Sequence, residues 1–112
     1  MSLDYLEEKT GRAVTELATS SESVEVRVAH AFTLHLVLGI HDADNGGYLP
    51  KDLLHRLQEV ERRLTTATDA GEEGVVMATA RAMNDAEASE VAQEMVAIDA
   101  EVRVLCEEQS GR

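Results

Sequence analysis

The sequence predicts an all-α protein, folded as a small antiparallel bundle of four or five helices in a single domain spanning residues 1–112. Three observations support this prediction. Apolar residues recur three and four residues apart in four segments, as they do on the buried face of a helix. The chain contains 15 alanines, the residue with the highest helix propensity. No two segments alternate apolar and polar residues in a way that would let strands pair.

The first helix is expected to cover residues 3 to about 18, with the hydroxyl of Ser2 as its N-cap. Gly11 weakens the middle of this helix, because glycine has a low helix propensity. A polar, serine-rich cluster at residues 19–23 predicts a break near Ser20. The apolar stripe of this helix consists of Leu3, Leu6, Ala13, Val14 and Leu17.

Residues 24–40 are ambiguous, because most of their large apolar side chains fall on even positions, from Val24 to Ile40. Such alternation is typical of a strand. A strand of this length would extend about 56 Å, however, and no other segment offers a partner for its backbone hydrogen bonds. We therefore predict a helix in the centre of the bundle, with a strand as the alternative.

Residues 41–49 carry the densest turn signal in the chain, because Asn45, Gly46 and Gly47 all tolerate positive φ. We expect a turn there, followed by Pro50 at the first position of a helix that continues to about residue 67. This is the clearest helix in the sequence. Its apolar positions are Leu53, Leu57, Val60, Leu64 and Ala67.

A second connection is expected at residues 69–74, where two glycines interrupt the apolar pattern, and a short helix follows at residues 75–83. Asn84 and Glu87 have the spacing of a capping box, which would start a last helix at residues 85 to about 109. A single kinked helix is the alternative. The apolar stripe of the last helix comprises Val91, Met95, Ile98, Val102 and Leu105.

The composition limits the classes of partner. The chain has 22 acidic and 10 basic side chains, a formal net charge of −12, so we expect no direct binding to nucleic acid. No run reaches the roughly 18 apolar residues of a membrane span, and Met1 is followed by acidic residues rather than by a basic and apolar leader. One cysteine cannot build a disulfide framework. We expect a cytoplasmic protein that does not bind membranes.

Catalytic motifs are absent from the sequence, which has no nucleophile elbow and no phosphate-binding glycine loop. Glu107 and Glu108 are expected to raise the pKa of the neighbouring Cys106 thiol, which favours a packed side chain over a nucleophile. We expect no enzyme activity, no catalytic residue and no cofactor.

Half of a calcium-binding loop is matched by Asp42, Asp44, Gly47 and Leu49. Leu53 stands where that loop has its bidentate glutamate, so a plain turn explains the pattern better. His30 lies about 16 Å from His41 along a helix, and His35 lies about 140° from His30 around it, so these histidines cannot close one site without ligands from other helices. We expect no bound metal. The alternative function is a small-ligand or metal-binding domain that uses the turn His41-Asp42-Ala43-Asp44.

Five glutamates form one stripe along the last helix: Glu87, Glu90, Glu94, Glu101 and Glu108. The simplest interpretation is a solvated flank beside the core. The functional interpretation is a docking surface for a basic protein partner, including a nucleic-acid-binding protein whose groove the stripe would occupy by mimicking nucleic-acid charge.

A further face of the last helix carries Ala92, Val96 and Ala100, so that more than half of its circumference is apolar. We expect the chain to form a homodimer through Ala92 and Val96. Together with four glutamates of the stripe, these residues are the predicted partner-binding surface: Glu87, Glu90, Glu94, Glu101, Ala92 and Val96. The favoured function is that of a non-enzymatic acidic helical protein with a regulatory or adaptor role in protein–protein association.

Overall fold

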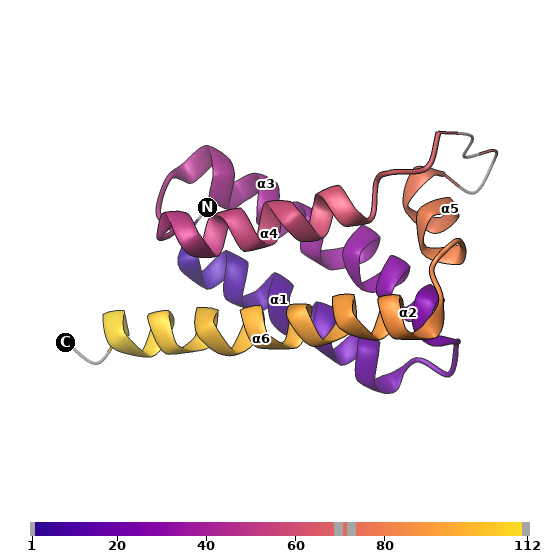
Figure 1. The fold of residues 1–112 in the computed structure, drawn as a ribbon. Coiled ribbons are helices and arrows are strands. Elements are labelled where there is room, and N and C mark those ends of the chain that lie inside the picture. The colour runs from indigo at the N-terminus through magenta and orange to yellow at the C-terminus, as the bar shows by residue number, and fades with distance from the viewer. Residues whose placement is uncertain (1, 69–70, 72–73, 111–112) are drawn as a thin grey trace.

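The computed structural model describes residues 2–68, 71 and 74–110, and its secondary structure over them is entirely helical. The elements are α1 (Leu3–Thr19), α2 (Val24–Ala31), the π-helical turn η1 (Phe32–Leu36), α3 (Val37–Gly46), α4 (Lys51–Arg63), α5 (Val75–Arg81) and α6 (Asp85–Ser110). Because α2, η1 and α3 are continuous, the described residues form five helical segments. Figure 1 shows that the four long segments alternate in direction, with the short α5 between α4 and α6. The predicted all-α bundle is confirmed.

The ambiguous segment at residues 24–40 is helical, so the strand alternative is wrong. Val28, Phe32, Leu36 and Ile40 are buried along it. Apolar residues at every second position cover most sides of a helix, which suits a segment that contacts α1, α5, α6 and α4 along its length. The helical turn within this segment is of the π type over Phe32–Leu36.

The expected turn over residues 41–49 is wrong in its first half, because α3 continues to Gly46. Only the next residue, Gly47, leaves the helix with a left-handed φ of 65°. Its N–H donates to the carbonyl of Ala43 at 3.1 Å, which satisfies one of the last carbonyls of α3. A single left-handed residue is enough to end the helix, and Pro50 is the N-cap of α4 rather than its first helical residue.

The end of α4 was also predicted too late, since the helix stops at Arg63. The N–H of Ala67 instead donates to the hydroxyl of Thr79 at 2.9 Å, and that hydroxyl donates to the carbonyl of Val75 at 2.7 Å. The chain after α4 is therefore tied to α5 rather than extended as helix. Residues 69, 70, 72 and 73 of the expected connection lie outside the described residues.

The predicted capping box starts α6. The N–H of Asn84 donates to Glu87 Oε1 at 3.0 Å, and the N–H of Glu87 donates to Asn84 Oδ1 at 2.8 Å. Both bonds satisfy donors that the first turn of a helix leaves without partners. Because α5 has already ended at Arg81, two separate helices lie here rather than one kinked helix.

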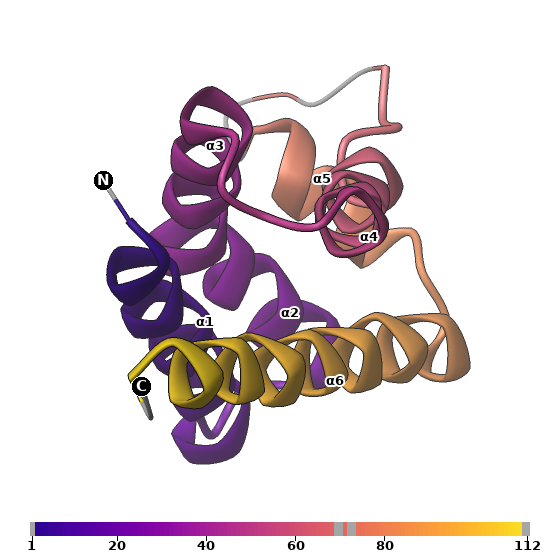
Figure 2. The same ribbon diagram turned by 90° about the vertical axis from the view of Figure 1, so that its left-hand side faces the viewer.

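One contiguous core joins the long helices, and α6 faces it with its predicted stripe: Val91, Met95, Ile98 and Val102 are buried, and Leu105 is partly buried. The main neighbour of α6 is α1. The crossing of α1 and α3 is close at Gly39, where a Cβ atom would lie 2.9 Å from Leu6 Cδ1. In Figure 2, α4 is seen nearly end-on, above α6 and across from α3.

Candidate functional site

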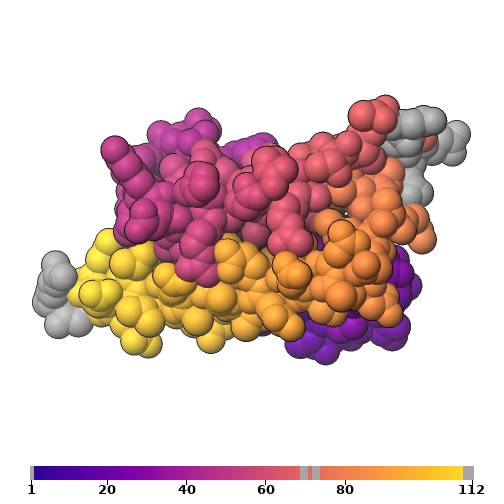
Figure 3. All heavy atoms as spheres, in the orientation of Figure 1, coloured from indigo at the N-terminus to yellow at the C-terminus, as the bar shows by residue number. Residues whose placement is uncertain are grey.

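The acidic stripe of α6 lies along its boundary with α4, and Figure 3 shows α4 seated against α6 on this face. Arg56 of α4 forms two parallel hydrogen bonds to Glu94, from Nε to Oε2 and from Nη2 to Oε1, both at 2.9 Å. Its Nη1 contacts Glu101. The hydrogen bonds from Arg56 lower the pKa of Glu94, and those to Glu94 and then Glu101 raise the pKa of Arg56.

The two other predicted glutamates of the stripe also have partners within the chain. Glu90 Oε1 lies 3.7 Å from Nη2 of Arg63, another arginine of α4. Glu87 is used in the cap of α6 with Asn84. All four glutamates that the sequence assigned to a partner surface are thus engaged internally. The basic groups that they attract belong to their own chain.

Free carboxylates are found at the end of the stripe, around a surface hollow of about 330 Å³ between the start of α4 and the end of α6. We call this the acidic hollow, and its lining residues are Pro50, Asp52, Leu53, Glu101, Val104, Leu105 and Glu108. Asp52 and Glu108 make no hydrogen bond or ion pair with any other described residue. Val104 is 54% exposed. The acidic hollow therefore combines an apolar lining with two carboxylates that have no cationic partner in the described part of the chain.

Of the two residues predicted to form the dimer face of α6, the structure exposes one and partly buries the other. Val96 is 48% exposed, as expected, but Ala92 is half-buried and packs against the core of its own chain. Ala100 and Val104 are exposed at four-residue steps beyond Val96. The outward apolar strip of α6 thus runs from Val96 toward the acidic hollow, and Ala92 contributes to the interior.

The alternative ligand set at residues 41–44 lies within the second half of helix α3 rather than in a loop. Each of its polar side chains has a different partner. His41 Nε2 lies 3.2 Å from Glu61 Oε2, the hydroxyl of Tyr48 donates to Asp42 at 2.6 Å, and Gln58 donates to Asp44 at 3.3 Å. Among the described residues, this set does not converge on a common point that could hold a metal ion.

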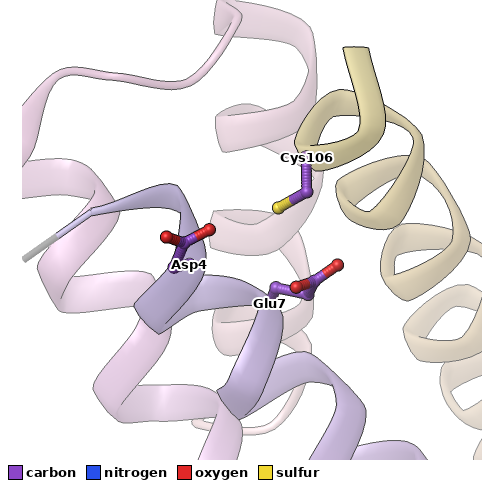
Figure 4. A group of neighbouring side chains, drawn as sticks. All are labelled: Asp4, Glu7 and Cys106. Carbon is purple, nitrogen blue, oxygen red and sulfur yellow. The ribbon is translucent and has the colours of Figure 1, made fainter. Parts of the chain in front are cut away.

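A different group of potential ligands does converge. Figure 4 shows Asp4 and Glu7 of α1 facing Cys106 of α6, and one ligand atom from each lies within 4.8 Å of the other two. Burial, followed by the charge of Glu7, raises the pKa of the Cys106 thiol to about 11. The thiol is therefore protonated at neutral pH, and it points to the carbonyl of Leu3 at 3.8 Å. A protonated, packed thiol is a poor ligand and a poor nucleophile.

The sequence predicted the direction of this pKa shift but assigned it to the wrong residues. Glu107 and Glu108 follow Cys106 in the chain but are exposed, whereas burial and the carboxylates of α1 cause the shift. Asp4 and Glu7 were missed because their proximity to Cys106 arises only when α1 packs on α6.

Comparison of the chain with protein family models, curated proteins and solved structures gave no match. None of the described helices is long and apolar enough to cross a membrane.

Proposed function

We propose that this chain is a non-enzymatic protein-association module that docks a basic, amphipathic segment of a partner protein in the acidic hollow. The observation that carries the proposal is the pairing of an apolar lining with two carboxylates, Asp52 and Glu108, that have no cation among the described residues. A regulatory or adaptor role follows from binding of this kind, because it requires no chemistry at the site.

The chemistry of the hollow selects its occupant. Asp52 comes from the first turn of α4 and Glu108 from the end of α6, so the two carboxylates approach the hollow from different helices. A lysine or arginine would pair with them while a neighbouring apolar side chain is buried against Val104 and Leu105. A neutral or acidic segment would leave the carboxylates without partners in the interface, which costs free energy.

The rest of the acidic stripe is a weaker candidate for docking. Arg56 and Arg63 already neutralise Glu94, Glu101 and Glu90, and a basic partner would have to displace these arginines. The same pairs argue against mimicry of nucleic-acid charge along the length of α6. The net charge of −12 still contributes by accelerating the approach of a basic partner, with a rate that falls as salt is added.

The experiment measures binding of a synthetic amphipathic helix of lysine and leucine by calorimetric titration. We expect the double substitution Asp52→Asn with Glu108→Gln to weaken binding about tenfold, since removing two surface ion pairs accounts for a loss of that order. The control is Glu22→Gln with Glu107→Gln, which changes the net charge equally but outside the hollow. Equal affinities for both double variants would contradict the proposal, because binding would then depend on net charge alone.

A further inference from the structure

A second exposed apolar surface lies on the continuous helix of α2, η1 and α3. Leu34 is 54% exposed and Leu38 is 47% exposed, although both are large aliphatic side chains. Leu34 also lines a hollow of about 350 Å³ between η1 and α5, together with His30, Val76 and Met77. We call this surface the leucine face. An exposed patch of this kind is typical of an interaction site.

The leucine face differs from the rest of the chain in its charge. Between Glu25 and Asp42 the sequence contains no acidic residue, and the segment 74–81 that forms α5 beside it contains none either. Two copies of a chain with a net charge of −12 repel each other over most of their surfaces. Two copies that approach through the leucine face therefore bring no acidic side chain of these two segments together.

We propose that a second copy of this chain docks on the leucine face, with the two helices antiparallel about a two-fold axis that crosses the interface at the level of Leu36 along the helix. Leu34 and Leu38 lie two residues on either side of Leu36, so the axis places Leu34 of one copy against Leu38 of the other. His30 and Asp42 lie six residues on either side, so the same axis pairs these two side chains across the interface.

The polar side chains at the ends of this interface can pair as hydrogen-bond donor and acceptor. His30 is half-buried beside Leu34, and among the residues that the structure describes no acidic one lines the hollow that the two share. Asp42 is partly exposed and uses one carboxylate oxygen, Oδ2, to accept the hydrogen bond from Tyr48, which leaves Oδ1 for a donor from the second copy. The symmetry forms this pair twice, so the leucine contacts are flanked on both sides by a hydrogen bond to a carboxylate.

The sequence predicted self-association through α6, whereas the proposed interface lies on the continuous helix of α2, η1 and α3. The outward strip of α6 is bordered by Glu101 and Glu107, and an antiparallel pair of α6 helices would bring such carboxylates together. The proposed interface also leaves the acidic hollow uncovered, since that hollow is formed by α4 and α6. The dimer and the docking of a basic partner are therefore independent, and either can fail without the other.

Sedimentation equilibrium over a series of protein concentrations tests the dimer. We expect the wild-type chain to dimerise with increasing concentration, and Leu34→Glu to weaken the dimer at least tenfold by placing a carboxylate in the interface. Val96→Glu is the matched control, because Val96 is similarly exposed on α6 and should have no effect. A wild-type chain that stays monomeric, or a dimer broken by Val96→Glu and not by Leu34→Glu, overturns the proposal.

A charge exchange tests the register of the two copies. His30→Asp should weaken the dimer, because it places a carboxylate against Asp42 of the second copy. Adding Asp42→His to the same chain should restore association, since the pair is then reversed. Circular dichroism verifies that each variant is folded, and Leu38→Glu replaces Leu34→Glu if that variant is not. Failure of the double variant to recover would overturn the two-fold register.

Discussion

Helix α6 is held in different ways on its two sides. On the α1 side, the hydroxyl of Thr10 donates to Asp99 Oδ1 at 2.8 Å, and both residues are less than 5% exposed. On the α4 side, α6 is held by ion pairs to Arg56 and Arg63. Both arginines are just under a third exposed, and their glutamate partners are more exposed. The α1 side therefore depends on buried packing and one buried hydrogen bond, and the α4 side on ion pairs that salt can screen.

The acidic residues of α6 have different roles, which depend on their burial and on their partners. Asp99 is buried and satisfied by Thr10 and by Arg103, whose Nη2 lies 3.0 Å away. Glu94 is at the surface and lowers the repulsion within the stripe by binding Arg56. Glu108 has no cation among the described residues, and we propose that it binds a basic partner. Net charge alone distinguishes none of these roles.

The largest effect on stability is expected from Thr10→Val, which tests the α1 side. Valine has a similar volume but removes the donor to the buried Asp99, so we expect a loss of about 1 to 3 kcal/mol in the free energy of unfolding. Urea denaturation measures it. Thr15→Val is the control, because the hydroxyl of Thr15 bonds the carbonyl of Gly11 at an exposed position. Equal losses would mean that the buried bond adds nothing to the α1 side.

The effect on stability of a substitution at the N-terminus of α6 should be independent of the contacts that α6 makes with α1 and α4. Asn84→Ala removes an acceptor of the capping box and is expected to cost about 1 kcal/mol, whereas Asn84→Asp keeps an acceptor and should cost less. Asp99 lies 15 residues further along α6, about 22 Å away. The losses of Asn84→Ala and Thr10→Val should therefore add in the double variant. Clear non-additivity in urea denaturation would show that the cap and the α1 side are coupled.

The smallest effect is expected from Arg56→Gln, which tests the α4 side. We expect a loss of up to about 1 kcal/mol at pH 7 and low salt, as for other partly exposed ion pairs. Arg56 lowers the pKa of Glu94 from 4.5 in the folded state, so its contribution is full above that pH and is lost as the pH falls and Glu94 is protonated.

The stabilities of wild type and Arg56→Gln should therefore converge toward pH 3 and at high salt, as followed by urea denaturation. Lys51→Gln is the control, because Lys51 is an exposed cation of α4 with no ion pair among the described residues. A difference between wild type and Arg56→Gln that stays constant across pH and salt would contradict the assignment of the α4 side to ion pairs.

The fold was predictable where local signals agreed. The spacing of Leu53, Leu57 and Val60 identifies α4, and the reciprocal cap at Asn84 identifies the start of α6. The turn signal before Pro50 misled, because residues that tolerate positive φ do not require it and only Gly47 adopts it. The alternation at residues 24–40 is typical of a strand, yet the predicted helix is confirmed, since a helix surrounded by neighbours needs apolar residues on most of its sides.

The candidate site was predictable only in part. Helical periodicity correctly placed the glutamates on one flank of α6, but it carries no information about the helix that packs beside them. Arg56 and Arg63 reach the stripe because α4 crosses α6, and the same packing places Asp52 and Glu108 around one hollow. Which carboxylates are paired and which are free is therefore a tertiary property.

The π-helical turn η1 has a consequence for changes in the length of the chain. A π-type turn holds one residue more than an α-helical turn and confines that surplus to itself. Deletion of one residue elsewhere in a helix would rotate all later side chains by about 100°. Deletion within Phe32–Leu36 would convert the turn to an α-helix and keep Gly39 facing Leu6 of α1. Leu34, the most exposed leucine among the described residues, therefore lies in the turn that contains one residue more than an α-helical turn.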